Sequence, residues 1–340
     1  MDVTKIKTYL ASNKVCFVTN SLAMPSTLLV SSLKTYIEYI PIQNFWLIPG
    51  IRDNKPFYGI DAFLLMLNYF LSNKNFDYVI YIDEDCFITD FYSLVNEFMN
   101  FTESGCVLAG PQDGGVFCHR NHSRLMINTF LSFWNIKLLR DKKITFDNII
   151  GYISNEFKNN SNTLYKDFIK KLINNNDKSL YMYMNEKSMN MINDVKTFRE
   201  SRVDLPNHET PYCKIVRDDP NNKIEPHQIP YTWDDDVAEI NFEPYYIIEQ
   251  ALVILSDSPI YYLFGTDLYD SDYIKRNVTF DTSGLTSAIF SYKPDNEFYD
   301  RKMIAVHTWF SRAYTKWPQT EEQLNHTKRI NSIIKNFSRI

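Results

Sequence analysis

Apolar residues follow two alternating patterns in the first quarter of the chain. Short β-prone runs occupy residues 14–20, 44–50 and 78–82, and they stop at polar residues, a Pro-Gly pair and carboxylates respectively. Between them, residues 25–37 and 59–76 place apolar side chains at the spacing of a buried helix face. Strands separated by helices predict an α/β domain with a mixed, mainly parallel central sheet flanked by helices.

The same patterns predict further elements downstream. We expect a helix over residues 91–101, strands over 106–111 and 116–120, a helix over 124–134 that Ser123 caps, a helix over 243–255, strands over 259–264 and 303–307, and an amphipathic helix over 320–340. Residues 140–236 are rich in Asn and Lys and have weak helical periodicity, which indicates a partly helical insertion. The chain therefore divides into residues 1–139, the insertion 140–236 and residues 237–340.

The third apolar run leads directly into the acidic sequence Asp83-Glu84-Asp85. In an open α/β sheet, ligands bind beyond the carboxyl ends of the strands. In extended geometry Asp83 and Asp85 share one side, whereas Glu84 points away and should tolerate replacement. Two convergent carboxylates beside apolar sequence favour a divalent cation, Mg²⁺ or Mn²⁺. The competing interpretation is a solvated acidic turn after a strand.

Charge and short motifs exclude several classes of protein. A formal net charge of −5 and a pI near 5.7 leave no broad basic surface for nucleic acid, although a nucleotide substrate needs only a few local cations. The sequence contains neither the Gly-x-Gly-x-x-Gly pattern of dinucleotide-binding domains nor the Gly-x-x-x-x-Gly-Lys-Ser/Thr pattern of P-loop enzymes.

Cysteine usage and hydropathy bear on the cellular compartment. The five cysteines are scattered and odd in number, which fits reduced thiols. Cys118, His119 and His122 could suggest zinc, but the absence of a second ligand pair at finger spacing favours a strand-to-helix junction. No signal peptide opens the chain, and no apolar run approaches the about 20 residues that span a bilayer. We expect a soluble cytoplasmic protein with, at most, peripheral membrane contact.

Four segments together resemble a known enzyme family. In the family's order, over residues 14–318, they are Asp83-x-Asp85 after a strand, Asp113-Gly114-Gly115, Glu249-Gln250, and strand-final His307 with Lys316-Trp317-Pro318. The chain thereby resembles GT-A fold glycosyltransferases, most of all the retaining glycogenin and lipooligosaccharide galactosyltransferase type. It departs from the family pattern at Asp113, where the family has Asn, at Glu249, where it has Asp, and in Lys-Trp-Pro, which replaces Lys-Pro-Trp.

The resemblance implies a GT-A, Rossmann-like fold and a metal site. Asp83, Asp85 and His307 would hold Mn²⁺ or Mg²⁺ across the phosphates of a nucleoside diphosphate sugar, and imidazole favours Mn²⁺. Lys316 or Arg312 would add a cation at the β-phosphate.

The resemblance also implies which residues meet the rest of the donor. Thr19 and Asn20, with the loop that holds Arg52 and Lys55, would border the base and ribose. The catalytic residues would be Glu249 and Gln250, facing the donor sugar. Residues 1–139 would then bind the nucleotide sugar, and residues 237–340 would carry the acceptor and catalytic half.

The expected function is metal-dependent transfer of a sugar, most readily from a UDP-sugar, to a glycan, lipid-linked or protein acceptor with retention. An inverting enzyme is the alternative, with Glu249 or a carboxylate of residues 234–236, such as Asp235, as the base. Two other classes remain open. An Asp-x-Asp phosphohydrolase would need the motif on its first strand and Thr or Val where Phe87 stands. A non-catalytic carbohydrate-binding protein would have no use for a site for metal and phosphate.

Overall fold

The computed structural model of the protein describes residues 3–21, 26–49, 51–52, 55–56, 60–111, 127–159, 245–267, 286–291 and 302–308. The expected strand over residues 116–120, most of the insertion 140–236 and the expected helix over 320–340 lie outside these residues. None of the helices in the described part of the chain is long and apolar enough to cross a membrane.

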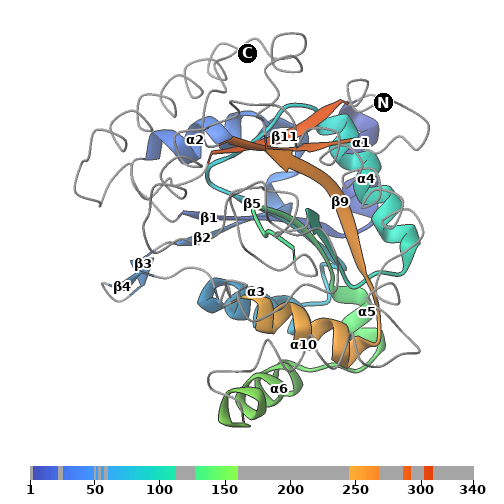
Figure 1. The fold of residues 1–340 in the computed structure, drawn as a ribbon. Coiled ribbons are helices and arrows are strands. Elements are labelled where there is room, and N and C mark those ends of the chain that lie inside the picture. The colour runs from blue at the N-terminus through green and yellow to red at the C-terminus, as the bar shows by residue number, and fades with distance from the viewer. Residues whose placement is uncertain are drawn as a thin grey trace, which may run out of the picture.

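A nine-stranded sheet in the order β2-β1-β5-β8-β7-β9-β10-β11-β6 forms the centre of the fold (Figure 1). Its strands are β1 (Val15–Ser21), β2 (Phe45–Pro49), β5 (Tyr78–Asp83), β6 (Cys86–Ile88), β7 (Leu108–Pro111), β8 (Leu131–Asn135), β9 (Ile260–Asp267), β10 (Thr286–Phe290) and β11 (Met303–Thr308). A separate two-stranded sheet pairs β3 (Ile51–Arg52) with β4 (Lys55–Pro56).

The large sheet is mixed and mainly parallel. The strands β2, β1 and β5 pair in parallel, as do β7 and β9, whereas β8, β10 and β6 pair antiparallel with their neighbours. Six of the nine strands therefore run in one direction. The sheet joins strands from residues 1–139 with strands from residues 237–340, because β9 pairs with β7 and β11 pairs with β6.

Helices cover both faces of the sheet. They are α1 (Val3–Ser12), α2 (Ser26–Lys34), α3 (Ile60–Ser72), α4 (Phe91–Ser104), α5 (Ile136–Asp141), α6 (Phe146–Asn159) and α10 (Tyr246–Ser256), with 3-10 turns at Ile37–Tyr39 and Ile42–Asn44. In Figure 1, α3 and α10 lie side by side below the sheet, and α4 lies on the opposite side.

Neighbouring residues of β5 show how the two helix layers use opposite faces of the sheet. The Tyr81 ring packs on Phe63 of α3, with ring centroids 4.9 Å apart. The Tyr78 ring packs on Phe98 of α4 at 5.5 Å. Because side chains alternate along a strand, Asp83 lies on the same face of the sheet as Tyr81. Its carboxylate therefore lies on the face that α3 covers.

The alternation read from the sequence identifies most of these elements. The strands predicted over residues 14–20, 44–50, 78–82, 106–111, 259–264 and 303–307 and the helices predicted over 25–37, 59–76, 91–101 and 243–255 all occur near the expected positions. Helix α1 carries two fully buried residues, Ile6 and Leu10, and was not predicted.

The helix predicted over residues 124–134 is wrong. Residues 131–135 form β8, which lies antiparallel between β5 and β7 with every side chain buried. Its sequence, Leu-Ser-Phe-Trp-Asn, has the aromatic content of a strand, and burial on both faces removes the alternation that would have identified it. Tertiary pairing therefore decides the structure of this segment.

The buried thiol of Cys16 makes stability depend on alkaline pH. Cys16 in β1 is 2% exposed, and burial raises its pKa from 9.0 to about 12. As pH rises through the ordinary thiol range, the unfolded chain loses this proton and the folded chain keeps it, so the free energy of unfolding falls. At about pH 10 the loss should reach about 1.4 kcal/mol for this group.

Urea denaturation of wild type and Cys16→Ala at about pH 8 and about pH 10 measures this loss. The stability of the variant should fall less over that interval, by about 1 kcal/mol or more. An equal fall in the free energy of unfolding of the two proteins would contradict the raised pKa of Cys16.

Candidate metal centre

The acidic motif lies at the turn that joins β5 to β6, two strands that are far apart in the strand order of the sheet. Strand β5 ends at Asp83, in register with Asn20 of β1, and residues 84–85 form a turn. At Cys86 the chain enters β6, which pairs with β11 at the other end of the strand order. Asp83 and Asp85 are therefore brought together by the turn, and the extended geometry assumed from the sequence ends at Asp83.

Glu84, between the two aspartates, is fully buried. Its burial leads us to expect that replacement costs stability, and the expectation that the site tolerates the change stays a prediction.

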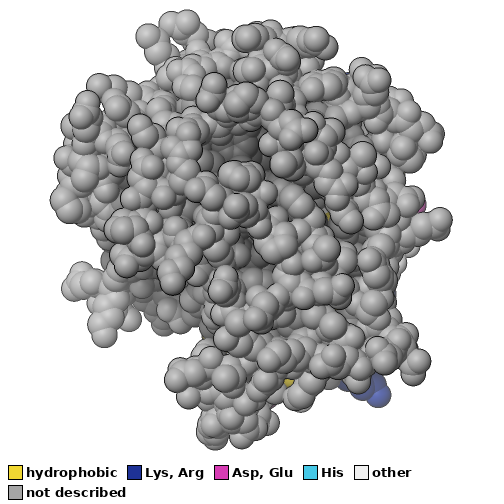
Figure 2. All heavy atoms as spheres, viewed as in Figure 1, with side chains coloured by type: hydrophobic (Ala, Val, Ile, Leu, Met, Phe, Trp, Pro, Cys, Tyr) yellow, Lys and Arg dark blue, Asp and Glu magenta, His cyan; other side chains and the backbone are white. Residues whose placement is uncertain are grey.

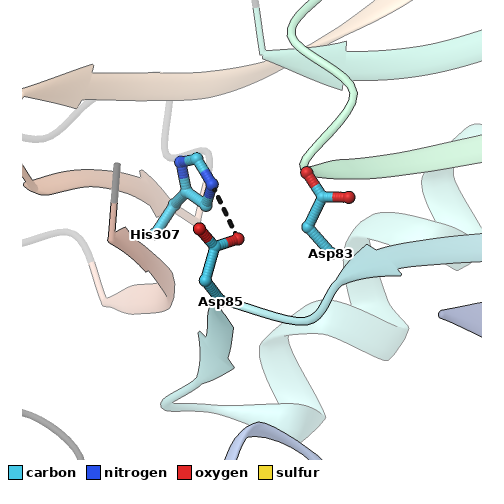
Figure 3. A group of neighbouring side chains, drawn as sticks. All are labelled: Asp83, Asp85 and His307. Carbon is cyan, nitrogen blue, oxygen red and sulfur yellow. Dashed lines mark hydrogen bonds and ion pairs between the residues drawn. The ribbon is translucent and has the colours of Figure 1, made fainter. Parts of the chain in front are cut away.

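Three side chains converge at this turn (Figure 3). Asp83, Asp85 and His307 each offer a ligand atom, and these atoms all lie within 4.8 Å of one another. His307 comes from β11, where it lies opposite Cys86 of β6. Its Nε2 atom lies 3.1 Å from Oδ1 of Asp85, a hydrogen bond when Nε2 carries the proton.

The cluster is largely withdrawn from solvent. Asp85 is 5% exposed and His307 is 9% exposed, whereas Asp83 is partly exposed. On the face drawn in Figure 2, no histidine side chain of the described residues is visible. Two carboxylates held together in such surroundings are costly unless positive charge lies between them.

Two hydrogen bonds fix Asp83. The Tyr81 hydroxyl donates to Oδ1 of Asp83 at 2.7 Å, and the Asp83 backbone N–H donates to the carbonyl oxygen of Phe130 at 2.9 Å. Burial, and then the negative charge of Asp83, raise the pKa of Tyr81 well above its ordinary value. The phenol therefore stays protonated and remains a donor to this carboxylate.

The His307 ring is fixed by stacking and by strand pairing. It lies on the Phe130 ring with centroids 4.4 Å apart and planes 3° from parallel. Strand β6, which pairs with β11, is in turn held by α2 and by Thr35, the residue that follows it. Ser32 Oγ donates to the Cys86 carbonyl at 2.5 Å, and the Ile88 N–H donates to Thr35 Oγ1 at 3.0 Å.

The donor set suits a hard or borderline divalent cation. Burial, and then the charges of Asp83 and Asp85, raise the pKa of the Cys86 thiol well above its usual range, and the converging ligand atoms of the described residues come from Asp83, Asp85 and His307. The donors are then carboxylate oxygens with one imidazole nitrogen, and these ligands fit Mn²⁺ and, with its weaker preference for nitrogen, Mg²⁺.

Of the residues predicted to border the nucleotide, two can be placed beside the metal cluster. Thr19 and Asn20 end β1 and are fully buried. The Asn20 amide lies near enough to Tyr81 to lower the pKa of its hydroxyl, yet neither amide atom makes a hydrogen bond of normal geometry.

The other predicted nucleotide-side residues are placed only in part. Arg52 and Lys55 belong to the two-stranded sheet β3-β4, and their side chains are not described. Lys316, Arg312 and Asp235 lie outside the described residues, as do Asp113-Gly114-Gly115 and the group Cys118, His119 and His122.

Glu249 and Gln250, the predicted catalytic residues, lie on α10 and are buried. Oε2 of Glu249 accepts a hydrogen bond from the backbone N–H of Ile127 at 3.0 Å. Both polar atoms of Gln250 are buried without a hydrogen-bond partner. The structure does not place either side chain in the group formed by Asp83, Asp85 and His307.

Sequence reasoning missed Tyr81 and Phe130. Tyr81 is two residues before Asp83, so strand alternation could have placed both on one side. Phe130 carries no such signal, because its contacts with Asp83 and His307 exist only after β8 inserts beside β5.

Comparison with known proteins adds little to these observations. No family model and no curated protein matches the chain. Among solved structures, A197 from STIV shows 15% sequence identity and a TM-score of 0.26, with 37% of this chain and 67% of that chain covered. A likeness of this size identifies neither a fold family nor a function.

Proposed function

We propose that the protein is a metal-dependent glycosyltransferase that moves a sugar from a nucleoside diphosphate sugar, UDP-sugar first, to a glycan, lipid-linked or protein acceptor. The observation that carries the proposal is the convergence of Asp83 and Asp85 with His307, which lies 222 residues from Asp85 in sequence. The Asp-x-Asp motif and the distant His near the end of a strand are the pair that the family resemblance joins, and the two lie together at the carboxyl end of β5. A GT-A arrangement of the mixed sheet is part of this proposal.

Asp83, Asp85 and His307 would hold the cation. When bound, Mn²⁺ or Mg²⁺ supplies positive charge that stabilises the diphosphate leaving group as the bond to the sugar breaks. The chain's own contribution is to fix the ligands: Tyr81 orients Asp83, and Phe130 fixes the plane of the His307 ring. Fixed ligands lose little conformational entropy on binding, which favours affinity.

The remaining assignments extend from this centre. The buried amide of Asn20, next to Thr19 and in register with Asp83, supports a role toward the nucleotide on the β1 side of Asp83. Arg52 and Lys316 are proposed for the nucleotide and its phosphates by resemblance. Gln250, whose buried amide has no hydrogen-bond partner, is proposed for the donor sugar.

The direct test is a panel of nucleoside diphosphate sugars incubated with the purified chain and Mn²⁺, with released nucleoside diphosphate as the readout. We expect one donor to be hydrolysed or transferred and EDTA to abolish the release. Absence of release from every donor, together with phosphate release from simple phosphate esters, would favour the phosphohydrolase instead. NMR of the product distinguishes retention from an inverting reaction with Glu249 or Asp235 as base.

Replacing His307 tests the third ligand. We expect His307→Ala to weaken Mn²⁺-dependent UDP binding by about 10-fold or more, with partial recovery at raised Mn²⁺, because two carboxylates remain. Isothermal titration with UDP measures this. If the variant is unstable but its folded fraction binds Mn²⁺ and UDP normally, His307 serves the core alone.

A further inference from the structure

We infer that Glu249 is a positioning residue for the metal centre, acting through the turn of residues 127–130. This inference rests on the proposed function only in requiring that the cluster binds a cation. It gives Glu249 a different task from the contact with the donor sugar that the sequence resemblance implies.

The first step is the buried anchor on α10. Glu249 has no exposed surface, and its Oε2 accepts the Ile127 N–H at 3.0 Å. A hydrogen bond from a backbone donor to a buried carboxylate is a strong one, and losing it leaves the donor without a partner in an apolar environment. Burial, and then the charge of Glu249, raise the pKa of Tyr262 on the neighbouring strand β9 well above its ordinary value, so that hydroxyl stays neutral beside the carboxylate.

The second step is the close fit of the turn against β7. The Asn128 N–H donates to the Pro111 carbonyl at 2.7 Å. A Cβ atom on Gly110 would lie 2.6 Å from Cδ1 and 3.0 Å from Cβ of Ile127, so a larger residue at position 110 would force Ile127 to shift. Ile127 is thus held on one side by β7 and on the other by Glu249.

The third step joins the turn to the metal ligands. Asn128 Oδ1 accepts the Phe130 N–H at 3.4 Å, and Phe130 contacts two ligands at once. Its carbonyl accepts the Asp83 N–H, and its ring stacks on His307. A shift of this turn would therefore change the separation of Asp83 and His307, which approach from different strands.

Mn²⁺ affinity of the full chain, measured by titration calorimetry without nucleotide, tests the inference separately from catalysis. We expect Glu249→Leu to weaken Mn²⁺ binding about 10- to 100-fold, the range typical of residues that support metal ligands. Glu249→Gln keeps an oxygen acceptor for the Ile127 N–H and should stay within about 3-fold of wild type. If Glu249→Leu fails to fold, Glu249→Asp decides, because it keeps the charge but shortens the reach and should also lose about 10-fold.

Glu97 on α4 provides a matched control. It is 5% exposed and accepts a hydrogen bond from the Tyr261 hydroxyl at 3.2 Å, and the Tyr261 ring lies against Phe101 of α4. Glu97→Leu should lower thermal stability and leave Mn²⁺ affinity unchanged.

The outcomes separate this inference from the proposed function. Normal Mn²⁺ affinity in Glu249→Leu or Glu249→Asp, with turnover lost, would overturn the positioning role and restore the catalytic one. Weakened Mn²⁺ affinity without any sugar transfer by wild type would leave the positioning role intact and overturn the glycosyltransferase. A wild-type chain that binds no Mn²⁺ would overturn both.

Discussion

Asp85→Ala should abolish sugar transfer and donor hydrolysis while leaving the fold in place. The substitution removes a carboxylate that lies within 4.8 Å of the other two ligand atoms and 3.1 Å from the His307 ring nitrogen. We expect turnover to fall at least about 1,000-fold. Without this ligand the cation would be lost, and its positive charge would no longer stabilise the leaving diphosphate. The thermal midpoint should change by only a few degrees, since the hydrogen bond to His307 is worth about 1 kcal/mol.

Two further variants make this result specific. Asp85→Asn keeps an oxygen acceptor for His307 but removes the charge, so it should fold like wild type and remain inactive. Asp90 follows β6 and caps α4 by accepting the Ser93 N–H at 3.0 Å. Asp90→Ala should cost about 1 kcal/mol of stability and keep activity. More than a tenth of wild-type turnover in Asp85→Ala would contradict the metal role.

Trp134→Ala should have the largest effect on stability, about 3–5 kcal/mol. Trp134 lies in β8, is 1% exposed, stacks on Phe63 of α3 at 5.2 Å and donates from Nε1 to Ser132 Oγ at 2.8 Å. The truncation would leave a cavity between the sheet and α3 and an unsatisfied hydroxyl. Urea denaturation followed by circular dichroism measures the change in the free energy of unfolding.

Trp46 is the matched control for this truncation. It lies on the edge strand β2, is only partly buried and packs against the exposed Tyr69 with ring centroids 4.6 Å apart. Because the site can be filled by solvent, Trp46→Ala should cost less than half as much as Trp134→Ala. Equal costs for the two substitutions would contradict the central, doubly covered position of β8.

Local sequence pattern predicts much of this fold because its strands and helices alternate cleanly. The runs that become β1, β2 and β5 are each followed by a recognisable helix or stop, so periodicity suffices. It fails for β8, whose register depends on insertion between β5 and β7. Nothing local in residues 131–135 specifies that neighbourhood.

The sequence predicts the three ligands of the candidate site but not the contacts that support them. Asp83 and Asp85 follow from an apolar strand that ends in carboxylates, and His307 follows from the order of motifs in the family resemblance. The supporting contacts of Phe130 and Ile127 could not be predicted, because they join β8, α10 and β11 only in the folded state. What the structure adds to the sequence is the close proximity of the three ligand side chains.

Isothermal titration of wild type with UDP, in the presence of Mn²⁺ and then of EDTA, tests the central claim most directly. Asp83, Asp85 and His307 are predicted to bind the nucleotide's phosphates through the cation. We therefore expect UDP to bind with Mn²⁺ at least about 10-fold more tightly than with EDTA. Equal UDP affinity in the two conditions, or no binding in either, would contradict the account.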